Sequence, residues 1–378
     1  MYKIIVNIDC RWEDVINLPN LFYYFNDCIK GLLWKENVAK AFCFDDLFVN
    51  SVYNLYKDNK GECVLDPLNH TVINERGKER LICSNTLKDR LISKTFNQSF
   101  LLPTFGPRLI YDNCASLKGK GVDFALNRSE YMLHRAYINY GNNFYILKLD
   151  VRHYFDSIYH PYIMSLISKF TTDYRILSYF NNCFIQFQND PFIHEGMPIP
   201  QGIGLGSECD QTFGLICLDE MDHIIKEQFR IKGYVRYMDD AVLISESKEQ
   251  LIEIYQYLQQ YLASQLYMEF NKDKSNITHI SEGIMFLKIH FYVTPIGAIY
   301  RKVYKPTIRR MVRKMKSFAE MLKDGEIAYT DINASYYSSM GTLLRADCKD
   351  QIKKVNALYN ELFIEDWINH KLDDFLIA

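Results

Sequence analysis

The chain has 378 residues, of which 48% are hydrophobic and 24% charged, a balance typical of a globular protein with a sizeable core. Its net charge of −2 counts against a uniformly basic nucleic-acid binder, so any such surface must be local or completed by a partner. No apolar run approaches the roughly 20 residues needed to span a bilayer, and Asp9, Arg11, Glu13 and Asp14 count against a signal peptide. The ten cysteines form no CxxC pair, which indicates reduced thiols in a cytoplasmic protein.

The predicted elements begin with a mostly helical region. Residues 21–56 mix aromatic and aliphatic side chains at helical spacing, until Gly61 and Pro67 interrupt the pattern. Two further helical stretches are expected within residues 78–150, where the turn-rich segment 117–121 separates them.

Strand-like segments follow in the middle of the chain. Branched and aromatic residues in 143–151 predict a strand that leads into Asp150. Residues 160–170 and 211–226 have the apolar spacing of helices. The segment 233–245 (GYVRYMDDAVLIS) places two short apolar runs around Met-Asp-Asp, which is typical of a hairpin.

The last third is predicted to combine a helix, two strands and further helices. Ser247 and Gln250 have the spacing of a capping box. The helix that they open carries an apolar face formed by Leu251, Ile254, Leu258, Leu262 and Leu266. Residues 285–294 and 298–304 predict strands around a Pro-Ile-Gly turn, and the chain is expected to be helical from Pro306 onward.

Three acids stand at the ends of predicted strands, namely Asp150, Asp239 and Asp240. Adjacent acids at a hairpin tip repel each other and destabilise the fold unless a cation neutralises them. Mg²⁺ ions would do so and would serve phosphoryl transfer, in which one ion activates an attacking 3′-hydroxyl and another stabilises the leaving pyrophosphate. An isolated Asp-Asp is more often a simple turn, but the apolar arms and the strand-ending Asp150 favour the metal interpretation.

These motifs resemble those of the reverse transcriptases. Residues 237–240 (YMDD) resemble the YxDD box of that family, and residues 150–158 (DVRHYFDSI) resemble its first catalytic motif, D-x-x-x-[FY]-[FY]-D-S-I. The resemblance extends over residues 30–345 and is strongest over residues 78–316. It implies an α+β right-hand polymerase with fingers, a palm formed by an antiparallel sheet backed by helices, and a helical thumb.

The resemblance also implies roles for individual residues. The implied metal ligands are Asp150, Val151, Asp239 and Asp240. Residues 77–82 resemble the finger strand that holds the incoming triphosphate, so Lys78 and Arg80 would bind it; a solvated charged strand is the alternative. Phe155 stands where the family has the steric gate that excludes a ribose 2′-hydroxyl, or else it is a core residue. Tyr237 completes the implied substrate-binding set.

Two loops are similar to further family segments. Pro-Gln-Gly at 200–202 resembles the loop that packs against the template, where glycine allows close approach. The family usually has QGxxxS, whereas residues 201–207 are one residue longer, so Gln201 is the implied template contact unless the register places Gly206 at the motif glycine. Lys274 matches a lysine near the pyrophosphate that would act as a general acid, with an ordinary loop lysine as the alternative.

The start of the expected thumb is basic. Residues 283–287 resemble the primer-grip hairpin, with Lys288 in place of the usual glycine. Residues 301–316 (RKVYKPTIRRMVRKMK) then contain eight basic residues and no acid. A basic helix here would follow nucleic-acid phosphates, although a charge run alone is more often a solvated face. The predicted nucleic-acid-binding residues are Arg301, Lys302, Arg309, Arg310 and Arg313.

Three regions are predicted: an N-terminal helical and fingers extension (1–75), a fingers and palm core (76–295), and the end of the primer grip with a helical thumb (296–378). The implied cofactor is a pair of Mg²⁺ ions, for which Mn²⁺ can substitute. The implied partners are an RNA template, dNTPs and the DNA product, together with a second protein subunit or a second copy of the chain, and no membrane.

Residues 113–121 and 218–223 resemble bacterial members of the family, which act in retrons, diversity-generating retroelements and phage defence. The low net charge and the variant glycine loop favour the defence-associated group, whose members copy a dedicated noncoding RNA. Template-independent or protein-primed synthesis on the same palm is a second hypothesis, and a non-enzymatic RNA-binding scaffold is a third. The presence of Asp150, Asp239 and Asp240 favours an active polymerase.

Overall fold

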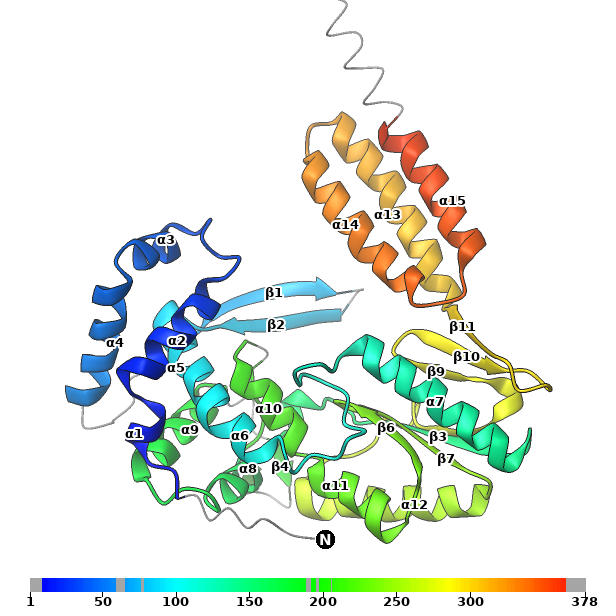
Figure 1. Ribbon diagram of the computed structural model, residues 1–378, viewed down its shortest axis with the longest axis horizontal. Helices are drawn as coiled ribbons and strands as arrows, with labels where there is room; N and C mark the ends of the chain where they lie inside the picture. The colour runs from blue at the N-terminus through cyan, green and yellow to red at the C-terminus, as the bar shows by residue number, and fades with distance from the viewer. Residues whose placement is uncertain are drawn as a thin grey trace, which may run out of the picture.

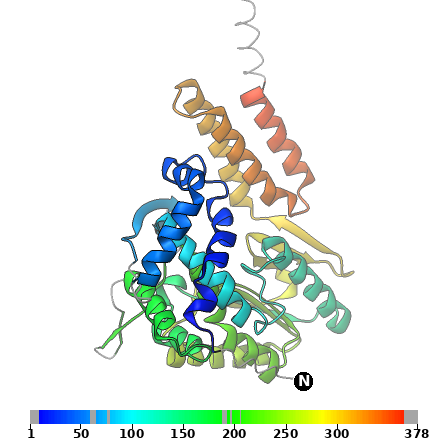
Figure 2. The ribbon, with the colours of Figure 1, turned by 60° about the vertical axis from the view of Figure 1, so that its left-hand side comes forward.

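A computed structural model describes residues 9–58, 65–75, 78–187, 192–194, 197–204 and 206–364. The N-terminal region is helical, as the sequence predicts, with α1 (Trp12–Val15), α2 (Leu18–Ile29), α3 (Glu36–Cys43) and α4 (Asp45–Asp58). Asn17 caps α2 by accepting a hydrogen bond from the backbone of Asn20. Figures 1 and 2 show these helices (blue) on the opposite side of the molecule from the C-terminal helices.

A hairpin follows the N-terminal helices and projects from their edge (Figure 1). Its strands, β1 (Asn69–Glu75) and β2 (Lys78–Ser84), pair antiparallel. Thr86 then caps α5 (Leu87–Phe96), which continues through the π-helical turn η1 (Asn97–Leu101) into α6 (Leu102–Phe105). The predicted boundary between residues 75 and 76 therefore falls inside this hairpin.

The central sheet is antiparallel and has the strand order β6-β7-β3-β8. Its strands are β3 (Tyr145–Asp150), β6 (Gly233–Tyr237), β7 (Asp240–Ser245) and β8 (Asn276–His279). Alternate residues of one strand enter different clusters, because Ile146 packs with α7 (Val122–Tyr140) and Leu147 packs with α12 (Lys248–Tyr261). Both faces of the sheet are therefore covered by helices.

The segment between β3 and β6 is mostly helical. Its elements are η2 (Phe155–Ser157), α8 (His160–Ile167), α9 (Tyr174–Phe187), β4 (Phe192–His194), β5 (Met197–Ile199), α10 (Glu208–Ile216), α11 (Asp219–His223) and η3 (Ile224–Gln228). The helix predicted over 211–226 is interrupted near Leu218, whose ψ of 12° departs from helical geometry.

The predicted apolar face of α12 is confirmed, since its five leucine and isoleucine residues are all fully buried, the last two lying in η4 (Leu262–Leu266). Ser247 caps this helix by accepting a hydrogen bond from the backbone of Gln250. The side chain of Gln250 instead accepts a hydrogen bond from Ser245. The predicted reciprocal capping box is therefore only half formed.

A second small sheet connects the central sheet to the C-terminal helices. It follows η5 (Ile280–Glu282) and has the order β11-β10-β9, formed by β9 (Ile284–Phe286), β10 (Ile289–Val293) and β11 (Ile299–Val303). The single strand predicted over 285–294 is wrong, because Leu287 and Lys288 have φ of 48° and 69° and turn the chain. The predicted boundary at 295/296 falls between β10 and β11.

Three helices form the C-terminal bundle, as expected for the chain after Pro306. They are α13 (Lys305–Lys323), α14 (Tyr329–Leu344) and α15 (Lys349–Tyr359), followed by η6 (Asn360–Ile364). Figure 1 shows this bundle (orange to red) standing above β9, β10 and β11. Among the residues that the structure describes, no helix is long and apolar enough to cross a membrane.

Candidate active site

Asp150 and Asp240 face each other across neighbouring strands. They are paired in the register of β3 with β7, so their side chains leave the same face of the sheet. The β6–β7 hairpin turns through Met238 and Asp239, between the paired residues Tyr237 and Asp240. Of these two turn residues only Met238 has a positive φ, at 56°, which is the pattern of a type II′ turn and favours glycine at that position.

The backbone and the carboxylate of Asp150 are both held by the loop that precedes β8. Its backbone N–H donates to Ser275 Oγ over 3.1 Å, and its carbonyl accepts from the N–H of Asn271 over 2.8 Å. Lys274 Nζ lies 3.1 Å from each oxygen of the Asp150 carboxylate. The structure thus brings two predicted catalytic residues, Asp150 and Lys274, into direct contact.

Asp240 is largely buried, with 18% of its side chain exposed. Burial raises the pKa of its carboxyl to about 7, and the charges of Asp239 and Asp150 act in the same direction, while Lys148 lowers the pKa. Lys148 Nζ lies 3.6 Å from Asp240 Oδ1, yet that oxygen has no hydrogen-bond partner. A buried acceptor without a donor is costly, so this oxygen is suited to a ligand that brings a positive charge.

The donor set fits a divalent cation. Mg²⁺ prefers a few carboxylate oxygens and completes its octahedral shell with water and substrate phosphates. Asp150 and Asp240 supply such oxygens on one face of the sheet, and Asp239 follows Met238 at the turn. Within the described ranges, no group of three acidic, histidine or cysteine side chains is already arranged as a metal cage. Val151, the fourth residue in the predicted ligand set, has an apolar side chain and donates its N–H to the carbonyl of Asp239.

Phe155 lies beside the hairpin tip. A Cβ atom added to Gly214 would lie 3.3 Å from Phe155 Cε1 and 3.6 Å from Met238 Sδ. Tyr154, next to Phe155, donates a hydrogen bond to the carbonyl of Gly214. The ring of Phe155 is therefore packed against α10 on one side and is only partly buried.

Gln201 lies between Phe155 and α10 in the chain and pairs with Tyr159 through an isolated bridge. Its side-chain Oε1 is buried without a hydrogen-bond partner. Gly206 is in close contact with the end of β2, because an added Cβ would lie 1.5 Å from the carbonyl oxygen of Cys83. Glycine is therefore required at 206 on packing grounds, whichever register the loop takes relative to the family motif.

The remaining predicted substrate and nucleic-acid residues lie in three places. Tyr237 is half-buried, and burial raises the pKa of its hydroxyl. The side chains of Lys78 and Arg80 lie outside the described residues, although their backbone belongs to β2. Arg301 lies in β11, where its guanidinium contacts Glu130 and donates to Asn127.

The basic segment is therefore divided between a strand and a helix, rather than forming one basic helix. On α13, Met311 and Met315 are buried against the bundle. The opposite side of the helix is exposed and carries Arg309, Arg310, Arg313, Lys314 and Lys316. Lys302, at the end of β11, is also exposed and lies over the ring of Tyr292.

Sequence reasoning did not assign a role to Arg236, which is the largest fully buried side chain of the described part of the protein. It forms a two-pronged ion pair with Asp222, through Nε and Nη2 at 2.7 Å each. Lys148 beside Asp240 was also missed. In both cases the available indication was a charged residue inside an otherwise apolar strand.

A palm sheet that carries paired acids, with a hairpin-bearing helical region on one side and a helical bundle on the other, defines a right-hand polymerase of α+β architecture. A family model described as "Reverse transcriptase (RNA-dependent DNA polymerase)" matches residues 68–291. The chain therefore belongs to the reverse transcriptase family.

Three solved structures illustrate the similarity in fold. The telomerase from Candida albicans, in complex with the TWJ fragment of telomeric RNA, is 12% identical over 86% of this chain and 65% of that chain, with a TM-score of 0.45. The apo telomerase from Candida tropicalis is 13% identical over 86% and 63%, with a TM-score of 0.46. Its form truncated from the C-terminal domain is 14% identical over 66% and 58%, with a TM-score of 0.43. The chain thus spans less than two thirds of each, and no curated protein matches the sequence.

Proposed function

We propose that the protein is an RNA-directed DNA polymerase that adds dNTPs to a primer by two-metal phosphoryl transfer. The observation that carries the proposal is the cross-strand pair of Asp150 and Asp240, with a buried Asp240 oxygen that lacks a donor. Family membership over residues 68–291 supports the same chemistry. Mg²⁺ is the proposed ion, with Mn²⁺ as a substitute, and when bound it would polarise the phosphate and lower the pKa of the attacking hydroxyl.

The residues of the chain have separate tasks in this proposal. Asp150, Asp239 and Asp240 hold the ions, with the carbonyl of Val151 as a further oxygen. Lys274 keeps Asp150 ionised in the absence of metal, at 3.1 Å from both oxygens. Being 59% exposed, it is free to move to the leaving pyrophosphate, to which it would donate a proton.

Other residues select and orient the substrates. Phe155, wedged against Gly214, would block a ribose 2′-hydroxyl. Lys78 and Arg80 would bind the triphosphate, while Gln201 and Tyr237 would contact the template and nascent base pair. The exposed cations of α13 would follow the phosphates of the primer–template duplex. We further propose the predicted division into a fingers extension, a fingers and palm core, and a thumb.

We also propose a bacterial, defence-associated role on a dedicated noncoding RNA, with a diversity-generating retroelement as the alternative. The resemblance of residues 113–121 and 218–223 supports it, and these two segments meet at Arg236, which bonds to Asp112, Cys114 and Asp222. Sequencing the RNA that copurifies with the protein tests this role. One abundant noncoding species supports it, and a random sample of cellular RNA contradicts it.

A further inference from the structure

We propose that Arg236 and Asp222 form a positioning pair that fixes the direction of the Asp239 and Asp240 carboxylates from behind the hairpin. The inference deepens the proposed function, since it concerns the same metal-binding acids. Arg236 pairs with Ala241 in the hairpin register, whereas Tyr237 pairs with Asp240. Successive residues of a strand face opposite sides, so Arg236 points away from the substrate face and acts through the backbone.

The contacts of Arg236 converge on the turn. Its Nη1 donates to the carbonyl of Met238 over 3.0 Å, and its Nη2 donates to the carbonyl of Leu215 over 2.9 Å. Its guanidinium also binds both carboxylate oxygens of Asp222. One side chain thus ties the residue before Asp239 to the end of α10 and to α11. Both Arg236 and Asp222 are fully buried, which shields these bonds from competition with water.

The turn needs such a constraint. Met238 has a φ of 56°, and a non-glycine residue in the left-handed region costs on the order of 1–3 kcal/mol and persists only when its surroundings enforce it. Asp222 is itself oriented by Tyr234, whose hydroxyl donates to Asp222 Oδ1 over 2.6 Å. Without the guanidinium, the carbonyl of Met238 would lose its donor, and the two acids that follow would lose their fixed direction.

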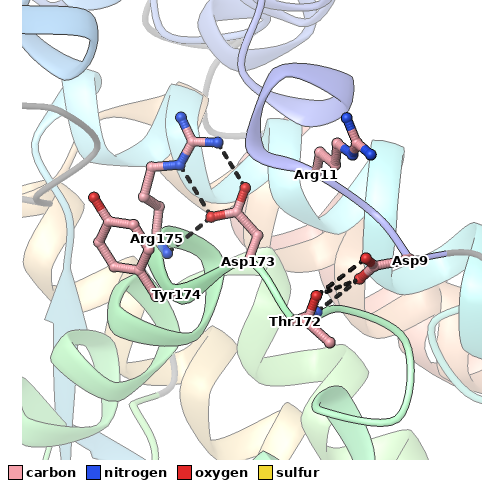
Figure 3. A pocket seen from close by; sticks show the side chains of 6 residues that line it. All are labelled: Asp9, Arg11, Thr172, Asp173, Tyr174 and Arg175. Atoms are coloured by element: carbon pink, nitrogen blue, oxygen red, sulfur yellow. Dashed lines mark hydrogen bonds and ion pairs between the residues drawn. The ribbon is translucent and has the colours of Figure 1, made fainter.

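The test uses a variant that removes both charges. Changing Arg236 alone would leave Asp222 charged and buried, which destabilises proteins by roughly 3–5 kcal/mol. Asp222→Asn/Arg236→Met is neutral and keeps an oxygen for Tyr234. Arg236→Lys is a second variant that keeps the charge balance but cannot form the fork. The matched control is Asp173→Asn/Arg175→Met, in the surface pocket of Figure 3, where Arg175 binds Asp173 and Asp173 also accepts from Trp12.

Two quantities are measured: Mn²⁺ binding to the metal-free protein by electron paramagnetic resonance, and single-nucleotide incorporation on an RNA template. We expect Asp222→Asn/Arg236→Met to lower Mn²⁺ affinity and kcat by about 10- to 100-fold, as loss of residues that orient metal ligands generally does. The KM for dNTP and the control variant should stay unchanged, and Arg236→Lys should show a smaller loss in the same direction.

The inference is overturned if Asp222→Asn/Arg236→Met or a folded Arg236→Lys binds Mn²⁺ and extends primers as the wild type does. It is also overturned if the control loses as much. If the wild type binds Mn²⁺ but extends no primer, the proposed function fails while Mn²⁺ affinity still decides the role of Arg236. If the wild type binds no Mn²⁺, both fail together.

Discussion

Asp240→Asn is expected to stabilise the metal-free protein at pH 8 and to lose this effect in acid. The pKa of Asp240 is raised from 3.8 to about 7, mainly by burial. Between these values the folded protein binds a proton that the unfolded chain has released, so stability falls as pH rises toward 7. At about 1.4 kcal/mol per pKa unit, a shift of about three units corresponds to a loss on the order of 4 kcal/mol at pH 8. Asparagine carries no charge and avoids that loss.

The assay is thermal unfolding in a metal chelator at pH values from 4 to 8. For large chains about 1 kcal/mol shifts Tm by about 2 °C, so the variant should melt about 8 °C above the wild type at pH 8. The difference should shrink steadily below pH 7. Asp210, whose pKa is also raised to about 7, is present in both proteins and cancels. Asp273→Asn, which changes an exposed carboxyl, should show no such pH-dependent difference.

The reasoning is refuted if Asp240→Asn melts below the wild type at pH 8. It is equally refuted if the difference between the two proteins does not change with pH. Either result would mean that the Asp240 carboxylate is already well compensated in the metal-free protein, by Lys148 or by the backbone of Leu287. The metal fit would then lose its main support.

Three further predictions concern selection, binding and the turn of the small sheet. Phe155→Ala should reduce discrimination between dNTPs and NTPs by roughly 10- to 100-fold, measured as the ratio of kcat/KM values, and an unchanged ratio would mean that Phe155 is only a core residue. Arg309→Ala/Arg310→Ala/Arg313→Ala should weaken duplex binding uniformly across sequences and reduce the salt slope by about one for each phosphate that is no longer bound. The triple alanine variant of Lys349, Lys353 and Lys354 on α15 is the control, and equal effects in both would place the duplex-binding surface elsewhere. Lys288→Gly should change the free energy of unfolding by less than about 1 kcal/mol, because position 288 has a φ of 69°, whereas Lys288→Val should destabilise by roughly 1–3 kcal/mol; equal effects in chemical denaturation would contradict this explanation.

Elements with a strong local pattern could be predicted from the sequence. The strand before Asp150 and the hairpin around Met238 and Asp239 were both found, because apolar alternation and a two-residue turn are local properties. The buried face of α12 was found for the same reason. The turn at Leu287 and Lys288 was missed because neither residue is a usual turn former, and only the surrounding structure imposes a positive φ on them.

The candidate site was only partly predictable, for a related reason. Motif spacing identified Asp150, Asp239 and Asp240, but not the residues that tune them from other elements. Lys148 reaches Asp240 from the neighbouring strand, and Arg236 reaches Asp222 on α11. Such partners are set by tertiary contacts between segments that the sequence does not place together. Arg301 illustrates the opposite error, since its charge suggested a phosphate contact while the fold gives it Glu130 and Asn127.

The most direct test of the proposed activity is primer extension on an RNA template with Mg²⁺ and dNTPs, comparing the wild type with Asp239→Asn/Asp240→Asn. The RNA that copurifies with the protein serves as template beside a generic one, so that a requirement for the natural RNA is met. We expect DNA synthesis by the wild type and none by the variant, which should still bind the duplex. Extension by both proteins would contradict the assignment of the metal-binding acids, and extension by neither on either template would contradict the polymerase itself.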